Sequence, residues 1–144
     1  MYANKVRHYQ KEAIKTRLAS ADPYQIIQML MEGAIESMKI AKIMIENRDF
    51  EGKSRALSKA SSIIDSLRVS LDMEVGGDIT ENLASLYFYM TRRLTEASIQ
   101  NDSIMVEEVI SLLSTIKTAW DSIPESAKIE AFSTRESRLG VAGG

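Results

Sequence analysis

The sequence predicts an all-α fold, an antiparallel up-down four-helix bundle with an N-terminal cap segment and a flexible or short-helical C-terminal tail. The chain has 144 residues but only two prolines, so long stretches lack the residue that most strongly interrupts a helix. Apolar residues recur at alternating spacings of three and four, the period of one helix face. Turn-forming residues at 47–49, 76–78 and 101–102 divide this pattern into segments. Amphipathic helices joined by such short connections are typical of an up-down bundle.

The first predicted helix covers residues 23–47. Asp22 can cap its free amide groups, and Pro23 suits the first helical position, where the missing N–H group would have no partner in any case. The second predicted helix covers residues 49–74, with Asp49 as its cap. The seams expected to face the core are Ile27, Leu30, Ala34, Met38, Ala41 and Ile45 in the first helix and Leu57, Ala60, Ile64, Leu67 and Leu71 in the second.

The third predicted helix covers residues 78–100 and follows a break at Gly76–Gly77. Three consecutive aromatic residues, Tyr87, Phe88 and Tyr89, point about 100° apart around such a helix. They cannot all face one seam, so at least one of them is expected to reach a second apolar surface. The predicted seam itself consists of Ile79, Leu83, Leu86, Met90 and Leu94.

The fourth predicted helix starts after Asp102 and stops at Pro124. Its seam is predicted to consist of Met105, Val109, Leu112, Ile116, Trp120 and Ile123. The predicted organisation is therefore a cap segment over residues 1–22, a bundle over 23–124 and a tail over 125–144.

The first helix carries more apolar side chains than one face of a bundle requires. Beyond its seam it holds Ile26, Met29, Met31, Ile35, Ile40, Ile43 and Met44. Methionine is unbranched and polarizable, so it suits surfaces that adapt to a bound helix. We interpret the apolar surplus of the first and third helices as a groove for an amphipathic partner helix. Packing in the core is the alternative for each residue taken alone.

The composition argues against several function classes. The chain has no cysteine and one histidine, so the usual zinc and di-iron ligand sets cannot form, and we expect no enzyme active site and no cofactor. A net charge of −2 gives no electrostatic footprint for nucleic acid. The chain shows no signal peptide and no apolar run long enough to span a membrane, so we expect a cytoplasmic protein without membrane insertion. The pairs Arg92–Arg93 and Glu107–Glu108 are interpreted as exposed helix charges.

Short motifs along nearly the whole chain resemble those of one family. In the first half they are Met1-Tyr2, Tyr9, Ser20-Ala21-Asp22-Pro23, Met29-Leu30-Met31-Glu32-Gly33-Ala34, Leu57-Ser58-Lys59-Ala60, Ile63-Ile64-Asp65 and Leu71-Asp72. In the second half they are Gly76-Gly77-Asp78-Ile79, Asn82-Leu83, Leu86-Tyr87-Phe88-Tyr89-Met90, Arg92-Arg93-Leu94, Asn101-Asp102 and Ala119-Trp120. Through these motifs the chain resembles the FliS family, the flagellar export chaperones. It departs from the family pattern at Met31-Glu32, Phe88 and Ser98, which affects fine binding specificity more than the role itself.

The resemblance implies a binding function. It implies that the chain binds the C-terminal segment of flagellin, which is disordered in the free subunit, prevents premature polymerisation and aids delivery to the flagellar type III export apparatus. Family motif and apolar surplus coincide at nine candidates for the flagellin-binding groove: Ile27, Leu30, Met31, Ile63, Leu67, Leu71, Leu83, Leu86 and Tyr87.

The resemblance also implies further partners. Val6 and Tyr9 of the cap segment would cover the groove in the empty chaperone and, once displaced, signal the loaded state to an export gate component. An anti-sigma factor is a further partner that the resemblance suggests, and a monomer or weak homodimer is expected. The alternative is a helical-bundle interaction protein whose apolar surplus forms an obligate homodimer.

Overall fold

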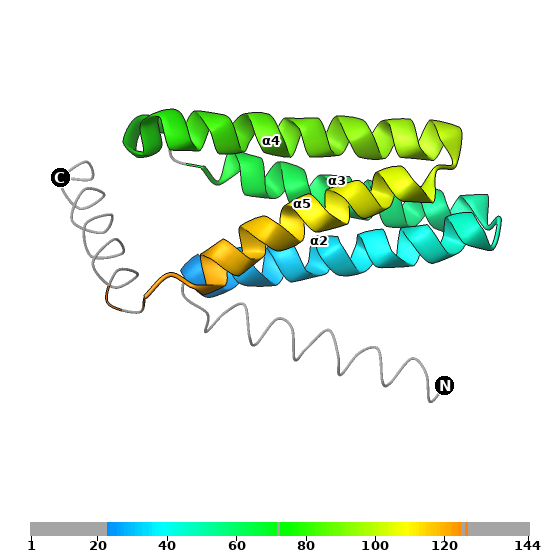
Figure 1. The fold of residues 1–144 in the computed structure, drawn as a ribbon, viewed down its shortest axis with the longest axis horizontal. Coiled ribbons are helices and arrows are strands. Elements are labelled where there is room, and N and C mark those ends of the chain that lie inside the picture. The colour runs from blue at the N-terminus through cyan, green and yellow to red at the C-terminus, as the bar shows by residue number, and fades with distance from the viewer. Residues whose placement is uncertain (1–22, 72, 125, 127–144) are drawn as a thin grey trace, which may run out of the picture. The chain divides into compact units, whose positions relative to one another are not determined.

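The structure is a computed structural model that describes residues 23–71, 73–124 and 126, without the side chains of residues 73–77. Its helices are α2 (Pro23–Glu46), α3 (Phe50–Val69), α4 (Met73–Gln100) and α5 (Ser103–Asp121) (Figure 1). The predicted all-α four-helix bundle is confirmed, whereas the predicted cap segment and nearly all of the predicted tail lie outside the described residues. Within the described ranges, no helix has the length and apolar character that crossing a membrane would require.

Asp49 and Asp102 each close one helix and begin the next. Their backbone N–H groups donate to carbonyls five residues earlier, at 2.8 and 3.0 Å, and the residues before them have positive φ, 61° at Arg48 and 52° at Asn101. A residue in the left-handed conformation commonly ends an α-helix in this way. Each aspartate carboxylate then accepts hydrogen bonds from N–H groups in the first turn of the following helix. The predicted cap at Asp49 is confirmed, and α5 begins after Asp102 as predicted.

The connection between α3 and α4 lies earlier than predicted. α3 ends at Val69, and Ser70 follows with its N–H donating to Ser66 O at 3.0 Å and its Oγ donating to Leu67 O at 2.7 Å. α4 begins before Gly76–Gly77 and continues through both glycines, so the predicted break there is wrong. A glycine costs a helix interior only about 1 kcal/mol relative to alanine, which is not enough to end a helix whose backbone hydrogen bonds continue.

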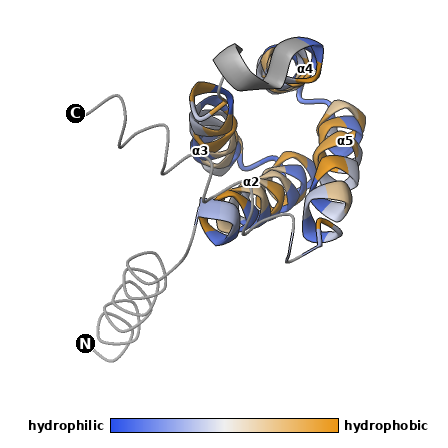
Figure 2. Ribbon diagram, turned by 90° about the vertical axis from the view of Figure 1, so that its left-hand side faces the viewer, coloured by the Kyte–Doolittle hydropathy of each residue, from blue (hydrophilic) through white to orange (hydrophobic). Residues whose placement is uncertain are grey.

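Residues 28–122 form one compact unit, in which the helices surround a common core. Figure 2 looks along this unit and shows α2, α3, α4 and α5 in order around it, so each helix is a neighbour of the next. The buried apolar side chains are Met31, Ala34, Met38, Ala41 and Ile45 of α2, Ala56, Leu57, Ala60, Ile64 and Leu67 of α3, Tyr87, Met90, Leu94 and Ala97 of α4, and Val106, Val109, Ile110 and Leu113 of α5.

The predicted seams agree with this core over most of α2 and α3 but only in part in α4 and α5. In α4, Tyr87 is buried where the prediction placed Leu86, and Ile79 is 79% exposed. In α5, the buried set includes Val106 and Leu113 where the prediction named Met105 and Leu112. Both helices carry an apolar arc wider than the core face, so spacing alone did not determine which edge of that arc would be buried.

α5 changes its neighbour along its length. It starts beside the end of α4, and within residues 28–122 its far end lies beside the part of α2 that holds Gln28 and Glu32 (Figure 1). There, Gln28 Nε2 donates to Asp121 Oδ1 at 2.8 Å, and Lys117 Nζ lies 3.7 Å from Glu32 Oε1. The N-terminal half of α4 therefore loses the cover of α5, which explains why an isoleucine on its inner side, Ile79, is exposed.

Candidate functional site

The nine predicted groove residues fall into two groups by burial. Met31, Leu67 and Tyr87 are 1%, 1% and 2% exposed. A side chain closed inside a densely packed core meets a partner only if the helices separate. The remaining six are half-buried and present apolar atoms at the surface: Ile27, Leu30, Ile63, Leu71, Leu83 and Leu86.

Leu30 and Ile63 lie on the side of the bundle where α2 meets α3. Gly33 follows Leu30 by one turn, and a methyl group built on its Cα would lie 3.6 Å from Ile63 Cδ1. Ile40, which is 45% exposed, and the half-buried Met44 continue this stripe at helical spacing. These five residues are called the α2–α3 surface.

Leu83 and Leu86 lie on a different side, toward α5. Leu86 precedes Tyr89 by three residues and Arg93 by seven, so the three share one face of α4. Tyr89 and Arg93 both contact Glu108 of α5, which shows that this face is turned toward that helix. Leu86 therefore continues the α4–α5 contact by one turn, into the region where α5 begins to leave α4.

Two apolar residues of α5 extend the same surface. Leu112 and Ile116 follow Glu108 by four and eight residues, and both are half-buried. The sequence prediction placed both residues in the core seam and so missed them. The opposite charges of Arg93 and Glu108 are the sequence signal that would have indicated these residues. Pairing the two charges across the helices shows which sides of α4 and α5 face each other. The α4–α5 surface consists of Ile79, Leu83, Leu86, Leu112 and Ile116.

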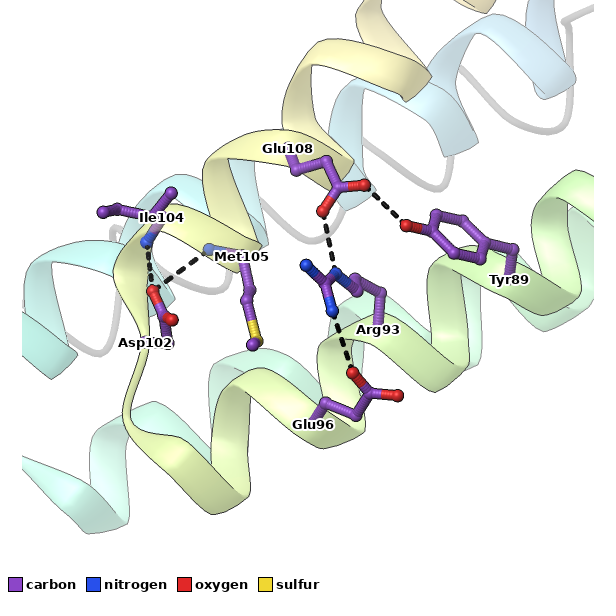
Figure 3. A network of polar contacts seen from close by, with 7 residues as sticks. All are labelled: Tyr89, Arg93, Glu96, Asp102, Ile104, Met105 and Glu108. Carbon is purple, nitrogen blue, oxygen red and sulfur yellow. Dashed lines mark hydrogen bonds and ion pairs between the residues drawn. The ribbon is translucent and has the colours of Figure 1, made fainter.

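Glu108 joins α5 to α4 through both of its carboxylate oxygens (Figure 3). Tyr89 Oη donates to Oε1 at 2.6 Å, and Arg93 Nε donates to Oε2 at 2.8 Å. Arg93 Nη1 also donates to Glu96 Oε2 at 2.9 Å. The hydrogen bonds from Tyr89 and Arg93 hold the pKa of Glu108 below its ordinary value, and the bond to Glu108 raises the pKa of Tyr89. These four residues are called the Glu108 clamp.

The same end of the bundle is fixed to α3 by Lys53, a buried cation. Its Nζ donates to Ser98 O at 2.9 Å and to Asn101 Oδ1 at 2.7 Å, and it lies 5.3 Å from the centroid of the Phe50 ring. An ammonium group at the C-terminal end of α4 also suits the negative end of the helix dipole. The connection end of the bundle is thus held together across three helices.

The three consecutive aromatic residues of α4 point in three directions. Tyr87 enters the core, and Phe88 is 53% exposed with the Arg92 guanidinium 5.9 Å from its ring centroid. Tyr89 reaches toward α5, where its hydroxyl binds Glu108. Of the three, Tyr89 is the one next to the α4–α5 surface.

The side of the bundle between α2 and α5 is polar. Lys42 Nζ lies 3.0 Å from Glu107 Oε2, and an open hollow of about 310 Å³ beside this pair is lined by Lys42, Ser103, Ile104, Glu107, Glu108 and Ser111. Across the described ranges, no group of three or more histidine, cysteine, aspartate or glutamate side chains could hold a metal ion. The apolar α2–α3 and α4–α5 surfaces remain as the candidate binding sites.

Comparison with known proteins places this bundle in a family. The family model described as "Flagellar protein FliS" matches residues 3–127. The chain belongs to the FliS family. This FliS-family chain is 41% identical to the "Flagellar secretion chaperone FliS" of Salmonella typhimurium, over 89% of this chain and 96% of that protein. It is 43% identical to the protein of the same name from Vibrio cholerae, over 81% and 85% of the two chains.

The relatives indicate the role of this chain, and a solved structure supports its fold. A "Crystal structure of flagellar chaperone from bacteria" has a TM-score of 0.65 with 12% identity and covers 78% of this FliS-family chain and 94% of its own, which supports the fold. The relatives' names identify flagellar secretion chaperones, so this chain is a flagellar export chaperone and not an enzyme. It binds a flagellar substrate. Val6 and Tyr9, predicted to cover the groove, lie outside the described residues.

Proposed function

We propose that this chain binds the disordered C-terminal segment of flagellin in the cytosol, prevents its premature polymerisation and aids its delivery to the flagellar type III export apparatus. The proposal is supported by membership of the FliS family and by the apolar side chains that the bundle leaves at its surface. An amphipathic segment that is uncovered before assembly needs a matching apolar surface on a folded partner.

The observation that carries the proposal is the α4–α5 surface. Leu83 and Leu86 are half-buried on α4, and Leu112 and Ile116 are half-buried on α5, one and two turns beyond Glu108, which contacts α4. Full burial of one leucine or isoleucine contributes about 1.5–3 kcal/mol, so four half-buried residues can contribute several kcal/mol when a helix covers them. This offsets the roughly 2–5 kcal/mol needed to order a disordered segment.

The α2–α3 surface gives the segment a second place to bind. Figure 2 shows α2 and α3 side by side and α4 and α5 side by side around the bundle, so the two surfaces lie on different sides of it. One short helix cannot cover both surfaces. A long segment that is free to bend can wrap around the bundle, and a disordered client suits this arrangement better than a folded domain.

The proposal is tested with a peptide of the organism's flagellin C-terminal segment. Titration should give one peptide per chaperone by calorimetry, with a gain of helix by circular dichroism. Leu86→Asp should weaken binding at least tenfold, since it places a charge on the surface that the client covers. Val69→Asp is the matched control, because Val69 is 76% exposed on α3 and belongs to neither surface. Absence of binding by the wild-type chain, or equal loss in both variants, would contradict the proposal.

The same experiment separates the proposal from an obligate homodimer. If the apolar surplus were a permanent dimer interface, light scattering would give twice the chain mass and the peptide would not bind. We expect a monomer or weak homodimer that becomes a one-to-one complex with the peptide.

Further partners belong to the proposal through the family resemblance. Val6 and Tyr9 are proposed to cover the groove in the empty chaperone and to signal the loaded state to an export gate component. Deleting residues 1–18 should leave the bundle folded and tighten or speed peptide binding; unchanged binding would contradict the covering role. An anti-sigma factor is a further proposed partner, to be checked by the same titration.

A further inference from the structure

The Glu108 clamp lies where the α4–α5 surface ends. Glu108 binds Tyr89 at 2.6 Å and Arg93 at 2.8 Å, and Leu86 and Leu112 come one turn further along the two helices. The clamp thus forms the boundary between a part of the α4–α5 contact that is joined directly and a part that is open to a partner.

The Glu108 clamp leaves no room for a partner helix between α4 and α5. An α-helix with its side chains is about 10 Å wide, whereas Glu108 bridges α4 and α5 through single hydrogen bonds. The carboxylate has both oxygens occupied, and Arg93 is held on its other side by Glu96 at 2.9 Å. Lys53 of α3 binds the C-terminal end of α4 near the clamp, so α4 is held against moving away from α5 at this end.

We infer that Glu108 is a positioning residue that ends the client surface and thereby sets how far a bound client helix extends toward the α4–α5 connection. The inference rests on the proposed function, because it concerns the register of the flagellin segment on the α4–α5 surface. Glu108 sets this limit by holding Tyr89 and Arg93 against α5, and it need not itself contribute to the affinity for the flagellin segment.

Register can be read by disulfide trapping, because the native chain has no cysteine. Ile104 and Thr115 lie on the Glu108 edge of α5, four residues before it and seven after it, and both are exposed. The probe is a set of flagellin C-terminal peptides, each with one cysteine at a successive position. Each peptide is mixed with full-length chaperone carrying Thr115→Cys or Ile104→Cys.

In the otherwise wild-type chain, peptides should cross-link at Thr115→Cys and not at Ile104→Cys. Adding Glu108→Ala should let the peptide advance by at least one helical turn, about 5.4 Å, so that cross-links form at Ile104→Cys. Glu108→Gln should restore the wild-type pattern at least in part, because its amide oxygen still accepts from Tyr89 or Arg93.

Glu107→Ala is the matched control, since it removes the same charge one residue away but breaks the contact to Lys42 of α2. It should leave the pattern unchanged. Equal shifts in the Glu107 and Glu108 variants, no shift in the Glu108 variant, or wild-type cross-links at Ile104→Cys would each overturn the inference. If peptides bind by calorimetry but never cross-link at Thr115→Cys, the inference fails while the proposed function stands. If they do not bind at all, both fail.

Discussion

Replacing Tyr87 and Leu86 separately by alanine distinguishes the core of the bundle from its proposed client surface. The two residues are neighbours on α4, and both were predicted from the sequence to contact flagellin. Tyr87 is 2% exposed, so its loss removes nearly all the burial of a large aromatic side chain. Truncations of this kind cost about 3–5 kcal/mol, a large part of the roughly 5–15 kcal/mol that stabilises a domain. Leu86 is half-buried, and its truncation should cost about 1–2 kcal/mol.

The assay combines urea unfolding followed by circular dichroism with peptide titration at low urea, where both variants are folded. Tyr87→Ala should lower the unfolding midpoint strongly and change peptide affinity little, whereas Leu86→Ala should lower the midpoint less and weaken peptide binding. If Tyr87→Ala kept its stability within about 1 kcal/mol and lost the peptide, Tyr87 would be a client contact and its placement in the core would be refuted.

Burial raises the pKa of Tyr87 to about 12 in the folded chain. The contribution of the buried phenol to the free energy of unfolding is therefore complete below pH 10 and should be lost as the pH rises from 10 toward 12. Tyr87→Phe should remove this alkaline loss.

Three further predictions concern the connections and the clamp. Gly52→Ala should cost about 1–3 kcal/mol in urea unfolding, because the new Cβ would lie 2.7 Å from Asp49 Oδ2, whereas Gly33→Ala, with its nearest contact at 3.6 Å, should be neutral or stabilising. Lys53→Met should cost about 1–3 kcal/mol by leaving two oxygens without their donor, and an unchanged unfolding midpoint would contradict its anchoring role. The pKa of Glu108 is lowered in the folded chain, so its stabilising contribution is present above the ordinary value of 4.5 and is lost as pH falls below it. The difference in unfolding free energy between wild type and Glu108→Gln should therefore shrink in acid and stay constant near neutrality.

The helices and two of their connections were predictable because they are set locally. Asp49 and Asp102 cap the helices that follow them, and a cap depends only on the residues of its own turn. The predicted break at Gly76–Gly77 was wrong because it was inferred from the local weakness of glycine in a helix. Glycine weakens a helix without ending it, whereas α3 ends at Val69, and the Ser70 hydroxyl donates back to Leu67 O in its last turn.

The candidate site was predictable only in part because it depends on which helices separate. Spacing showed that α4 has a wide apolar arc, but Tyr87 and Leu86 compete for the core, and the packing of the whole bundle decides between them. Leu112 and Ile116 were missed for a related reason. Their spacing fits the core seam, yet both are only half-buried, on a helix whose far end contacts α2 and not α4.

The crossing of α5 links the stability of the bundle to its function. A chaperone must keep apolar side chains at its surface without unfolding or losing them to its own core. Here polar contacts fix α5 at both ends, through Glu108 to α4 and through Asp121 and Lys117 to α2. Hydrogen bonds and ion pairs have fixed partners and geometry, whereas apolar contacts do not, so they can hold two helices apart over leucines that would otherwise close together. The residues that hold α5 in place are therefore as much a part of the proposed binding surface as the residues that we propose the client covers.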